Sequence, residues 1–350
     1  MAVATSVMTT GVLVPRLGGP DVLQVGPWEV AAPGPEEVRV RVEAAGISYA
    51  DLLVMQGVHP ERRKAPFVPG WDVVGVVESI GLAVTGVAVG DRVAGLTIVG
   101  GWAAHAIVPA ARLVAVPESI DATAAVCLVM DYIVAYQMLV RAARAQAGDT
   151  ILVQGAGGGV GTALMQVART LDVRVLAADR EQKRAHIEES GATLIDFETE
   201  DVVERCRALT GGRGVEAAFD GIGDTAWASW RAVRRGGRLV WFGMVTMLAG
   251  GGKSLRTIAK TSSLIASVFA PNLLPGGKRT SFYSIQMLAR KHPEWYRDDL
   301  AVLLDMHADG RMDPTIAAVW KLDEVPVAAD GLAHGAMPGK QVIAIPSQSG

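Results

Sequence analysis

The sequence predicts an α/β protein that combines a parallel-sheet domain with a second, β-rich domain. Three observations lead to this prediction. A glycine-rich turn, Gly155–Gly161, joins a short apolar run to an amphipathic run. Further on, strand-like and helix-like runs alternate, which is typical of a parallel sheet covered by helices. Between Val12 and Gly101, short alternating runs are broken by Gly and Pro, which indicates a small barrel-like β domain.

The glycine-rich turn predicts a binding site for a pyrophosphate group. It lies between a strand candidate, Ile151–Val153, and a helix candidate, Thr162–Leu171. Free N–H groups and the positive dipole end of a helix favour an anion, and glycines let the backbone approach it closely. The dinucleotide pattern has alanine first here, and by itself it leaves a plain tight turn as an equal alternative. The expected contacts are Ala156, Gly157, Gly158, Gly159, Val160 and Gly161.

Six strand-like runs extend this unit into a predicted Rossmann sheet, with the ligand at the carboxyl ends of the strands. The strand candidates are Ile151–Gln154, Val173–Ala178, Thr193–Asp196, Val215–Asp220, Arg238–Gly243 and Ser263–Phe269. The helix candidates between them include Glu181–Ser190, Asp201–Leu209 and Asp224–Val233.

Composition narrows the classes of protein. A chain of 350 residues has room for two domains, and 20% charged residues with a net charge of −3 argue against binding to nucleic acid or another polyanion. We see neither a signal-like N-terminal pattern nor an apolar run of membrane-span length, so we expect a cytoplasmic protein with no membrane partner. Cys127 and Cys206 are far apart in apolar surroundings, which favours buried thiols.

A set of motifs in one order along the chain carries a family resemblance. The motifs are Ala45–Asp51, Gln56-Gly57, Pro66–Gly70, Gly75–Val77, Gly90–Val93, Tyr136–Leu139, Gly155–Gly161, Ser190–Ala192, Gly236–Arg238, Phe242-Gly243, Asp309-Gly310 and Gly339-Lys340. The chain resembles the medium-chain dehydrogenase/reductase superfamily, in its zinc-free quinone oxidoreductase branch, similar to zeta-crystallin. The resemblance implies a GroES-like catalytic domain over 1–128 and 283–350, and a Rossmann domain over 129–282.

The resemblance also bears on metal binding. Zinc-dependent members have a cysteine where this chain has Ser48, and Gly-His-Glu where it has Gly70-Trp71-Asp72. Without those thiol and imidazole ligands we expect no zinc. Charge on a simple ketone oxygen usually needs a Lewis acid, whereas a conjugated acceptor spreads the charge. We therefore expect a quinone or an α,β-unsaturated ketone as the substrate.

The second strand candidate points to the nicotinamide cofactor in two ways. Asp179 lies at its end, where NAD-binding folds keep an acid for the ribose, and this favours NADH. The family alignment instead places the NAD-selecting acid at Ala178, and puts Arg180 and Lys183 where NADPH-binding members contact the 2′-phosphate. We expect NADPH, with solvated Arg180 and Lys183 as the alternative. The resemblance adds Phe242, Gly243 and Lys340 near the cofactor.

By resemblance, substrate and nicotinamide meet between the domains. The candidate catalytic residues are Tyr49, His59 and Asp131, and the candidate pocket residues are Ser48, Trp71, Met130 and Tyr132. Tyr49 is equally an ordinary core residue, and His59 equally a surface-loop residue. The family commonly has Asn where this chain has Asp131, and Thr where it has Val134. The change at Val134 removes a hydroxyl that touches the nicotinamide in the family.

Two further expectations concern the segment Met244–Gly277. Its part before Ser262 is a candidate lid over the cofactor. The uncharged run Ser262–Phe269 is a candidate edge strand that would pair with a second copy, so we expect a homodimer. Two other functions stay open: an enoyl reductase of a biosynthetic pathway, and a non-catalytic NADPH-binding sensor or structural protein.

Overall fold

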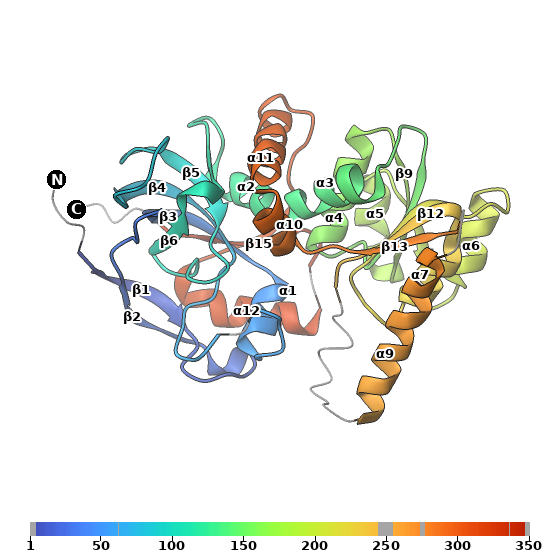
Figure 1. Ribbon diagram of the computed structural model, residues 1–350, viewed down its shortest axis with the longest axis horizontal. Helices are drawn as coiled ribbons and strands as arrows, with labels where there is room; N and C mark the ends of the chain where they lie inside the picture. The colour runs from blue at the N-terminus through green and yellow to red at the C-terminus, as the bar shows by residue number, and fades with distance from the viewer. Residues whose placement is uncertain (1–4, 62, 244–254, 274–276, 336, 347–350) are drawn as a thin grey trace. The chain divides into compact units, whose positions relative to one another are not determined.

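The computed structural model describes residues 5–61, 63–243, 255–273, 277–335 and 337–346 (Figure 1). The chain forms two compact units. The first contains Met1–Ile133 and His292–Gly350, and the second contains Val134–Lys291. These boundaries lie later than the predicted 128/129 and 282/283. The turn Leu128–Tyr132 falls in the first unit, and helix α10 (Ile285–Lys291) falls in the second.

The second unit contains the predicted parallel sheet. Its six strands are ordered β10-β9-β8-β11-β12-β13, and every neighbouring pair is parallel. The strands are β8 (Thr150–Gln154), β9 (Arg174–Asp179), β10 (Thr193–Asp196), β11 (Val215–Asp220), β12 (Val233–Trp241) and β13 (Arg279–Phe282). The helices are α3 (Ile133–Gln137), η4 (Met138–Ala143), α4 (Gly159–Thr170), η5 (Glu181–Lys183), α5 (Arg184–Glu189), α6 (Val202–Leu209), α7 (Ala226–Ala232), α9 (Leu255–Phe269), η6 (Ala270–Leu273) and α10.

One predicted strand is wrong. The run Ser263–Phe269 lies in helix α9, and the sixth strand is β13. Leu264 and Val268 are one helical turn apart and pack on the sheet core, whereas Ile265 is exposed. This is the period of a helix face, which a short uncharged run does not distinguish from a strand. The candidate lid is not described over residues 244–254, and its last part is the start of α9.

The first unit is β-rich, as predicted. It has a two-stranded antiparallel sheet of β1 (Val7–Leu13) and β2 (Gln24–Val30), and a seven-stranded sheet ordered β14-β15-β3-β4-β5-β7, with β6 beside β3. The remaining strands are β3 (Glu37–Ile47), β4 (Asp72–Ile80), β5 (Arg92–Leu96), β6 (His105–Pro109), β7 (Leu113–Ala115), β14 (Ile316–Trp320) and β15 (Lys340–Ala344). The helices are η1 (Pro20–Val22), α1 (Tyr49–Met55), η2 (Ala110–Arg112), α2 (Ala122–Cys127), η3 (Leu128–Tyr132), α11 (Pro293–Ala308), η7 (Leu322–Glu324) and α12 (Val325–His334).

Strand β15 returns the end of the chain to the N-terminal sheet. It pairs antiparallel with β3 and parallel with β14, and Figure 1 shows it in red beside the blue strands. The end of the chain therefore belongs to the sheet of the first unit. It brings Lys340 next to residues nearly three hundred positions earlier in the sequence.

A long apolar helical segment, Ala122–Ala143, runs through α2, η3, α3 and η4. Among the described residues it alone has the length and mean hydropathy, 1.7, of a membrane span, but 83% of that window is buried inside the protein. The core helix of a soluble protein has the same properties.

Cys127 in this segment and Cys206 on α6 are free and buried, which confirms the prediction of buried thiols.

Candidate functional site

The glycine-rich turn opens helix α4 with a glycine at its N-cap. Gly158 N–H donates to the Gly155 carbonyl at 3.2 Å, which closes the turn, and Thr162 N–H donates to the Gly158 carbonyl at 2.8 Å, which starts the helix. The N–H groups of the intervening first turn have no intrahelical partner and can bind an anion. A Cβ at Gly161 would lie 2.5 Å from the carbonyl oxygens of Gly155 and Ala156, so only glycine fits there.

Asp179 and Lys183 lie against this turn. The Asp179 carboxylate accepts the Gly157 N–H at 2.7 Å and the Arg180 N–H at 2.8 Å. The Lys183 side chain covers the turn, because a Cβ at Gly157 would meet its Cγ and Cδ at 3.0 Å. Burial lowers the pKa of Lys183, and Asp179 opposes that shift. The structure therefore brings both predicted cofactor residues to the glycine loop.

The Arg180 side chain pairs with Glu198 on the surface and not with the glycine-rich turn. Its Nε donates to Glu198 at 2.9 Å, and its guanidinium lies 5.8 Å from the centre of the Phe197 ring. The side chain is 62% exposed. To contact a 2′-phosphate, Arg180 has to exchange the Glu198 carboxylate for the ligand.

Phe242 and Gly243 follow the carboxyl end of β12. Phe242 N–H donates to the Asp220 carbonyl at 3.0 Å, and the Phe242 ring would contact a Cβ at Gly221. Because the strands are parallel, these residues lie at the same sheet edge as the glycine turn. The buried Asp220 at this edge was not predicted from the sequence. Its carboxylate accepts hydrogen bonds from the Ile222 and Gly223 N–H groups and from the hydroxyls of Thr225 and Ser229. An acid between a buried strand and Gly-Ile-Gly is the signal that could have found it.

In the first unit, Ser48 caps helix α1 and is held by Asp51. The Asp51 carboxylate accepts hydrogen bonds from the Ser48 N–H and hydroxyl, both at 2.9 Å, and from the Gly70 N–H at 2.9 Å. Asp51 is 1% exposed. Burial raises the pKa of Asp51 to about 7, although the hydrogen bonds from Ser48 oppose the shift. Asp51 therefore ties the Ser48 loop to the Gly70 turn and titrates near neutral pH.

Tyr49 and His59 are both half-buried, so neither is a fully enclosed core residue. Burial raises the pKa of Tyr49, and its hydroxyl keeps its proton at neutral pH. His59 packs edge-on against the fully buried Trp71, with 5.2 Å between ring centroids. Its Nδ1 accepts the Glu61 N–H at 3.0 Å, and burial lowers the pKa of the imidazole. Of the two, Tyr49 is the better proton donor at neutral pH.

Two of the predicted residues of the turn Leu128–Tyr132, Asp131 and Tyr132, make contacts within the first unit. Met130, Asp131 and Tyr132 are all buried. The Tyr132 hydroxyl accepts the Thr315 N–H at 3.0 Å. Two of the predicted pocket side chains, Met130 and Tyr132, are thus buried.

Lys340, expected near the cofactor, is enclosed between two carboxylates. Its Nζ lies 3.0 Å from Asp72 Oδ2 and 3.2 Å from Asp131 Oδ1. Burial by itself lowers the pKa of Lys340, but Asp131 and Asp72 outweigh it and the net shift is upward. Burial raises the pKa of Asp72, and Lys340 opposes that shift. An aspartate at the start of the apolar strand β4 is the sequence signal that could have revealed such a cluster, since buried charges are paired.

The positions that hold zinc in metal-dependent relatives do not fit zinc here. The Ser48 hydroxyl donates to Asp51, Trp71 offers only an indole N–H, and Asp72 already has the Lys340 ammonium as its cation. Among the described residues, no group of three or more His, Cys, Asp or Glu could hold a metal ion.

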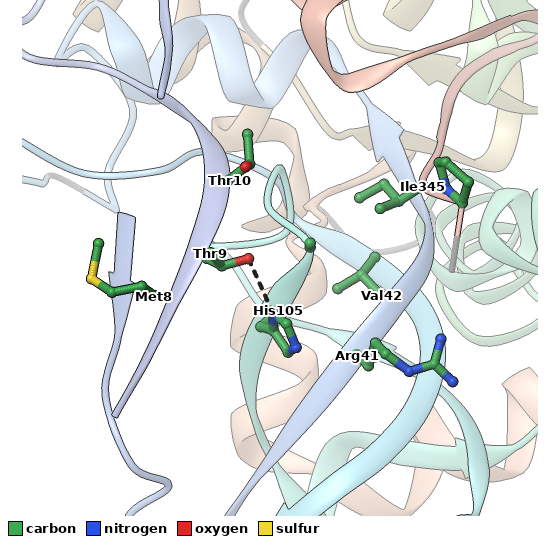
Figure 2. A pocket seen from close by; sticks show the side chains of 9 residues that line it. Met8, Thr9, Thr10, Arg41, Val42, His105 and Ile345 are labelled. Carbon is green, nitrogen blue, oxygen red and sulfur yellow. Dashed lines mark hydrogen bonds between the residues drawn. The ribbon is translucent and has the colours of Figure 1, made fainter. Parts of the chain in front are cut away.

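A cavity of about 420 Å³ lies in another part of the first unit, between β1, β3 and the end of β15 (Figure 2). His105 Nδ1 and the Thr9 hydroxyl are 3.0 Å apart on its wall. In Figure 2 the guanidinium of Arg41 extends away from His105, so the polar groups of the cavity do not converge on one point. None of its lining residues is a predicted site residue, and we do not assign it as the active site.

Comparison with known proteins places the chain in a family. Residues 34–118 match the model of the alcohol dehydrogenase GroES-like domain, and residues 159–279 match that of the zinc-binding dehydrogenases. The human synaptic vesicle membrane protein VAT-1 homolog is 32% identical over 87% of this chain and 77% of its own length. The chain belongs to the medium-chain dehydrogenase/reductase superfamily, in the zinc-free quinone oxidoreductase branch.

Solved structures of this superfamily share the whole architecture. The quinone oxidoreductase of Pseudomonas syringae pv. tomato has a TM-score of 0.83 at 28% identity, covering 96% of this chain and 100% of that one. The mycobacterial protein Rv1454c, solved in complex with NADPH, has a TM-score of 0.81 at 27% identity, with the same coverage. The predicted fold, a Rossmann domain with a GroES-like domain, is confirmed.

Proposed function

We propose that this chain is an NADPH-dependent oxidoreductase that works without zinc and transfers hydride to a conjugated carbonyl compound. The observation that carries the proposal is the open N-terminus of α4 at the glycine turn, with Asp179 and Lys183 beside it. That turn fits a pyrophosphate. The similar mycobacterial structure that contains NADPH supports the same assignment.

Lys183 favours NADPH over NADH. A 2′-phosphate brings close to two negative charges, and the Lys183 ammonium stabilises these charges more than it stabilises a ribose hydroxyl. Asp179 opposes this preference, because it is bonded to the Gly157 N–H and does not turn to solvent. Arg180 adds to the preference once it leaves Glu198.

The donor set of the first unit favours conjugated acceptors. When bound, NADPH supplies the hydride. Ser48, Trp71 and Asp72 do not form a zinc ligand set, so hydrogen bonds have to stabilise the charge that develops on the substrate oxygen. A conjugated system needs less of this stabilisation than a simple ketone. We assign Tyr49 as the proton donor, since its hydroxyl is protonated and only half-buried.

The test is the initial rate of NADPH oxidation, followed by absorbance, with five acceptors: an ortho-quinone, a para-quinone, a linear enone, an enoyl thioester and a saturated ketone. We expect turnover with quinones or enones and none with the saturated ketone. Turnover confined to the enoyl thioester would favour a biosynthetic enoyl reductase. Tight NADPH binding with no turnover would favour a non-catalytic sensor or structural protein.

We also propose that two copies associate in the cytoplasm through the sheet of the second unit. With Ser262–Phe269 in a helix, the edge strand on that side, among the described residues, is β13 and not the run first expected. The Asn272 side chain bonds to the N–H and C=O groups of Thr280 on this strand. An edge strand can pair with a second copy, which here would take over the hydrogen bonds that Asn272 makes to Thr280. Sedimentation at the mass of one 36.7 kDa chain would contradict the dimer.

A further inference from the structure

The cluster of Asp72, Asp131 and Lys340 joins three segments of the first unit that are far apart in the sequence. Asp72 is the first residue of β4, Asp131 lies on the turn η3, and Lys340 is the first residue of β15. The Lys340 ammonium contacts both carboxylates, at 3.0 and 3.2 Å. The three side chains are 0 to 6% exposed. The contacts are therefore shielded from solvent and ions.

Stability alone is a poor explanation for this cluster. Replacing a buried ion pair or triad with well-packed apolar side chains is often neutral or stabilising, because the charges lose their hydration. A buried ionic contact that persists is better explained by the geometry that it enforces. Here one cation sets the distance between two separate backbone segments.

Both segments carry residues of the predicted substrate pocket. Asp72 directly follows Trp71, and Asp131 lies between Met130 and Tyr132. The turn Leu128–Tyr132 has π-helical hydrogen bonding, a wider form of the helix that occurs often at functional sites. Such a turn needs tertiary contacts to hold it, and Lys340 and Thr315 provide them.

Strand β3 leaves space for the lysine. Gly46 lies beside β15, paired with Val342. A Cβ at Gly46 would collide with Lys340 Cε and would lie 2.5 Å from Asp72 Oδ1. The cluster thus extends to a glycine on the neighbouring strand, which lets the ammonium and the carboxylate approach each other.

We propose that Lys340 is a positioning residue: by holding Asp72 and Asp131 together, it fixes Trp71 and the turn Leu128–Tyr132 in the arrangement that recognises the acceptor. This replaces the expectation that Lys340 contacts the cofactor. The kinetic part of the inference rests on the proposed reductase function, whereas the structural part does not.

The test uses the full chain in four forms. They are wild type, Lys340→Arg, the triple variant Asp72→Asn/Asp131→Asn/Lys340→Met, and Val108→Ala. The triple variant is close in volume and leaves no unpaired buried charge. Val108 is fully buried on β6, so its truncation lowers stability without touching the cluster. Each form is measured for thermal stability, for KM of the acceptor and of NADPH, and for amide hydrogen exchange over Leu128–Ile133.

In the triple variant we expect kcat/KM for the acceptor to fall roughly tenfold or more, because small misplacements of a site are costly. KM for NADPH should stay at the wild-type value, and exchange over Leu128–Ile133 should quicken. Lys340→Arg keeps a cation between the two carboxylates, so its kcat/KM for the acceptor should lie between those of wild type and the triple variant. Val108→Ala should lower the melting temperature and leave both KM values unchanged.

Wild-type kinetics and exchange in the triple variant would overturn the proposal, as would an equal rise of acceptor KM in Val108→Ala. A loss of NADPH affinity in the triple variant alone would instead support the earlier expectation that Lys340 contacts the cofactor. If wild type turns over no acceptor, the proposed function fails, and exchange over Leu128–Ile133 alone decides whether Lys340 holds the turn.

Discussion

The two units use the same kinds of charged residue in opposite ways. In the first unit, Lys340 lies between Asp72 and Asp131, and all three are buried. In the second unit, Arg180 pairs with Glu198 on the surface at 2.9 Å, with both side chains more than half exposed. The distances are alike, but the surroundings are not.

The difference shows that burial, more than distance, decides what an ion pair does. An exposed pair contributes about 0–1 kcal/mol, and its partners exchange easily. Removing one partner of a buried pair costs about 3–5 kcal/mol, because a charge is left without water. The first arrangement suits a site that has to keep its shape, and the second suits a contact that has to open for a ligand.

The largest expected effect is on the buried cluster. Lys340→Met leaves two buried carboxylates without their cation, so the free energy of unfolding should fall by about 3–5 kcal/mol. Urea denaturation measures this change. The matched control is Lys64→Met, at an exposed lysine of the same unit, which should change stability by less than about 0.5 kcal/mol. Similar losses of unfolding free energy in both variants would contradict the claim that the buried lysine contributes more than the exposed one.

Asp51 should make the first unit sensitive to pH. Its pKa of about 7 in the folded protein exceeds the value of about 3.9 expected in the unfolded chain. The folded state then holds a proton that the unfolded chain releases, so the stabilising contribution is complete below about pH 4 and declines as pH rises to about 7. Relative to Asp51→Asn, wild type should lose roughly 2–4 kcal/mol over that range. Parallel stability curves for the two proteins would contradict this.

Gly46→Ala probes the space around the cluster. The new methyl group would collide with Lys340 Cε and approach both Asp72 oxygens, so we expect a loss of about 1–3 kcal/mol. Gly26→Ala on β2 is the control, since a Cβ there has nothing within 4 Å. Thermal unfolding of the two variants measures the difference. Equal melting temperatures would show that the Lys340 and Asp72 side chains shift to make room for the methyl group.

Lys183 is a partly buried cation of the second unit, whereas Arg180 is exposed. Lys183→Met should weaken NADPH binding roughly tenfold, because the Lys183 ammonium is expected to contact the 2′-phosphate. NADH binding should change little. Fluorescence titration of both cofactors gives the ratio, and a ratio that stays at the wild-type value would exclude Lys183 from cofactor selection.

Arg180 should show the smallest effect. It is exposed and already paired with Glu198, so Arg180→Ala should weaken NADPH binding only roughly two- to fivefold and NADH binding less. Glu198→Gln frees the guanidinium and should strengthen NADPH binding by a similar factor. Equal losses for the two cofactors in Arg180→Ala would mean that the arginine is only a solvated surface residue.

Much of the fold followed from local patterns. The glycine turn, the alternating runs and the motif order predicted both units, because turn chemistry and hydrophobic period are properties of neighbouring residues. The exception was Ser263–Phe269, where a short uncharged run fits a strand and a helix equally well. Only the packing of Leu264 and Val268 on the sheet core distinguishes them.

The sequence by itself determined the family, the glycine turn and the absence of zinc-type ligands at Ser48 and Trp71, since each is written in adjacent residues. The tertiary structure decided which charges are buried and which partners they have. Lys340 meets Asp72 and Asp131 because β15 returns beside β3, whereas Arg180 meets Glu198 at the surface. An ion pair depends on distance and on exposure to water, and distant parts of the chain acquire both only when they fold together.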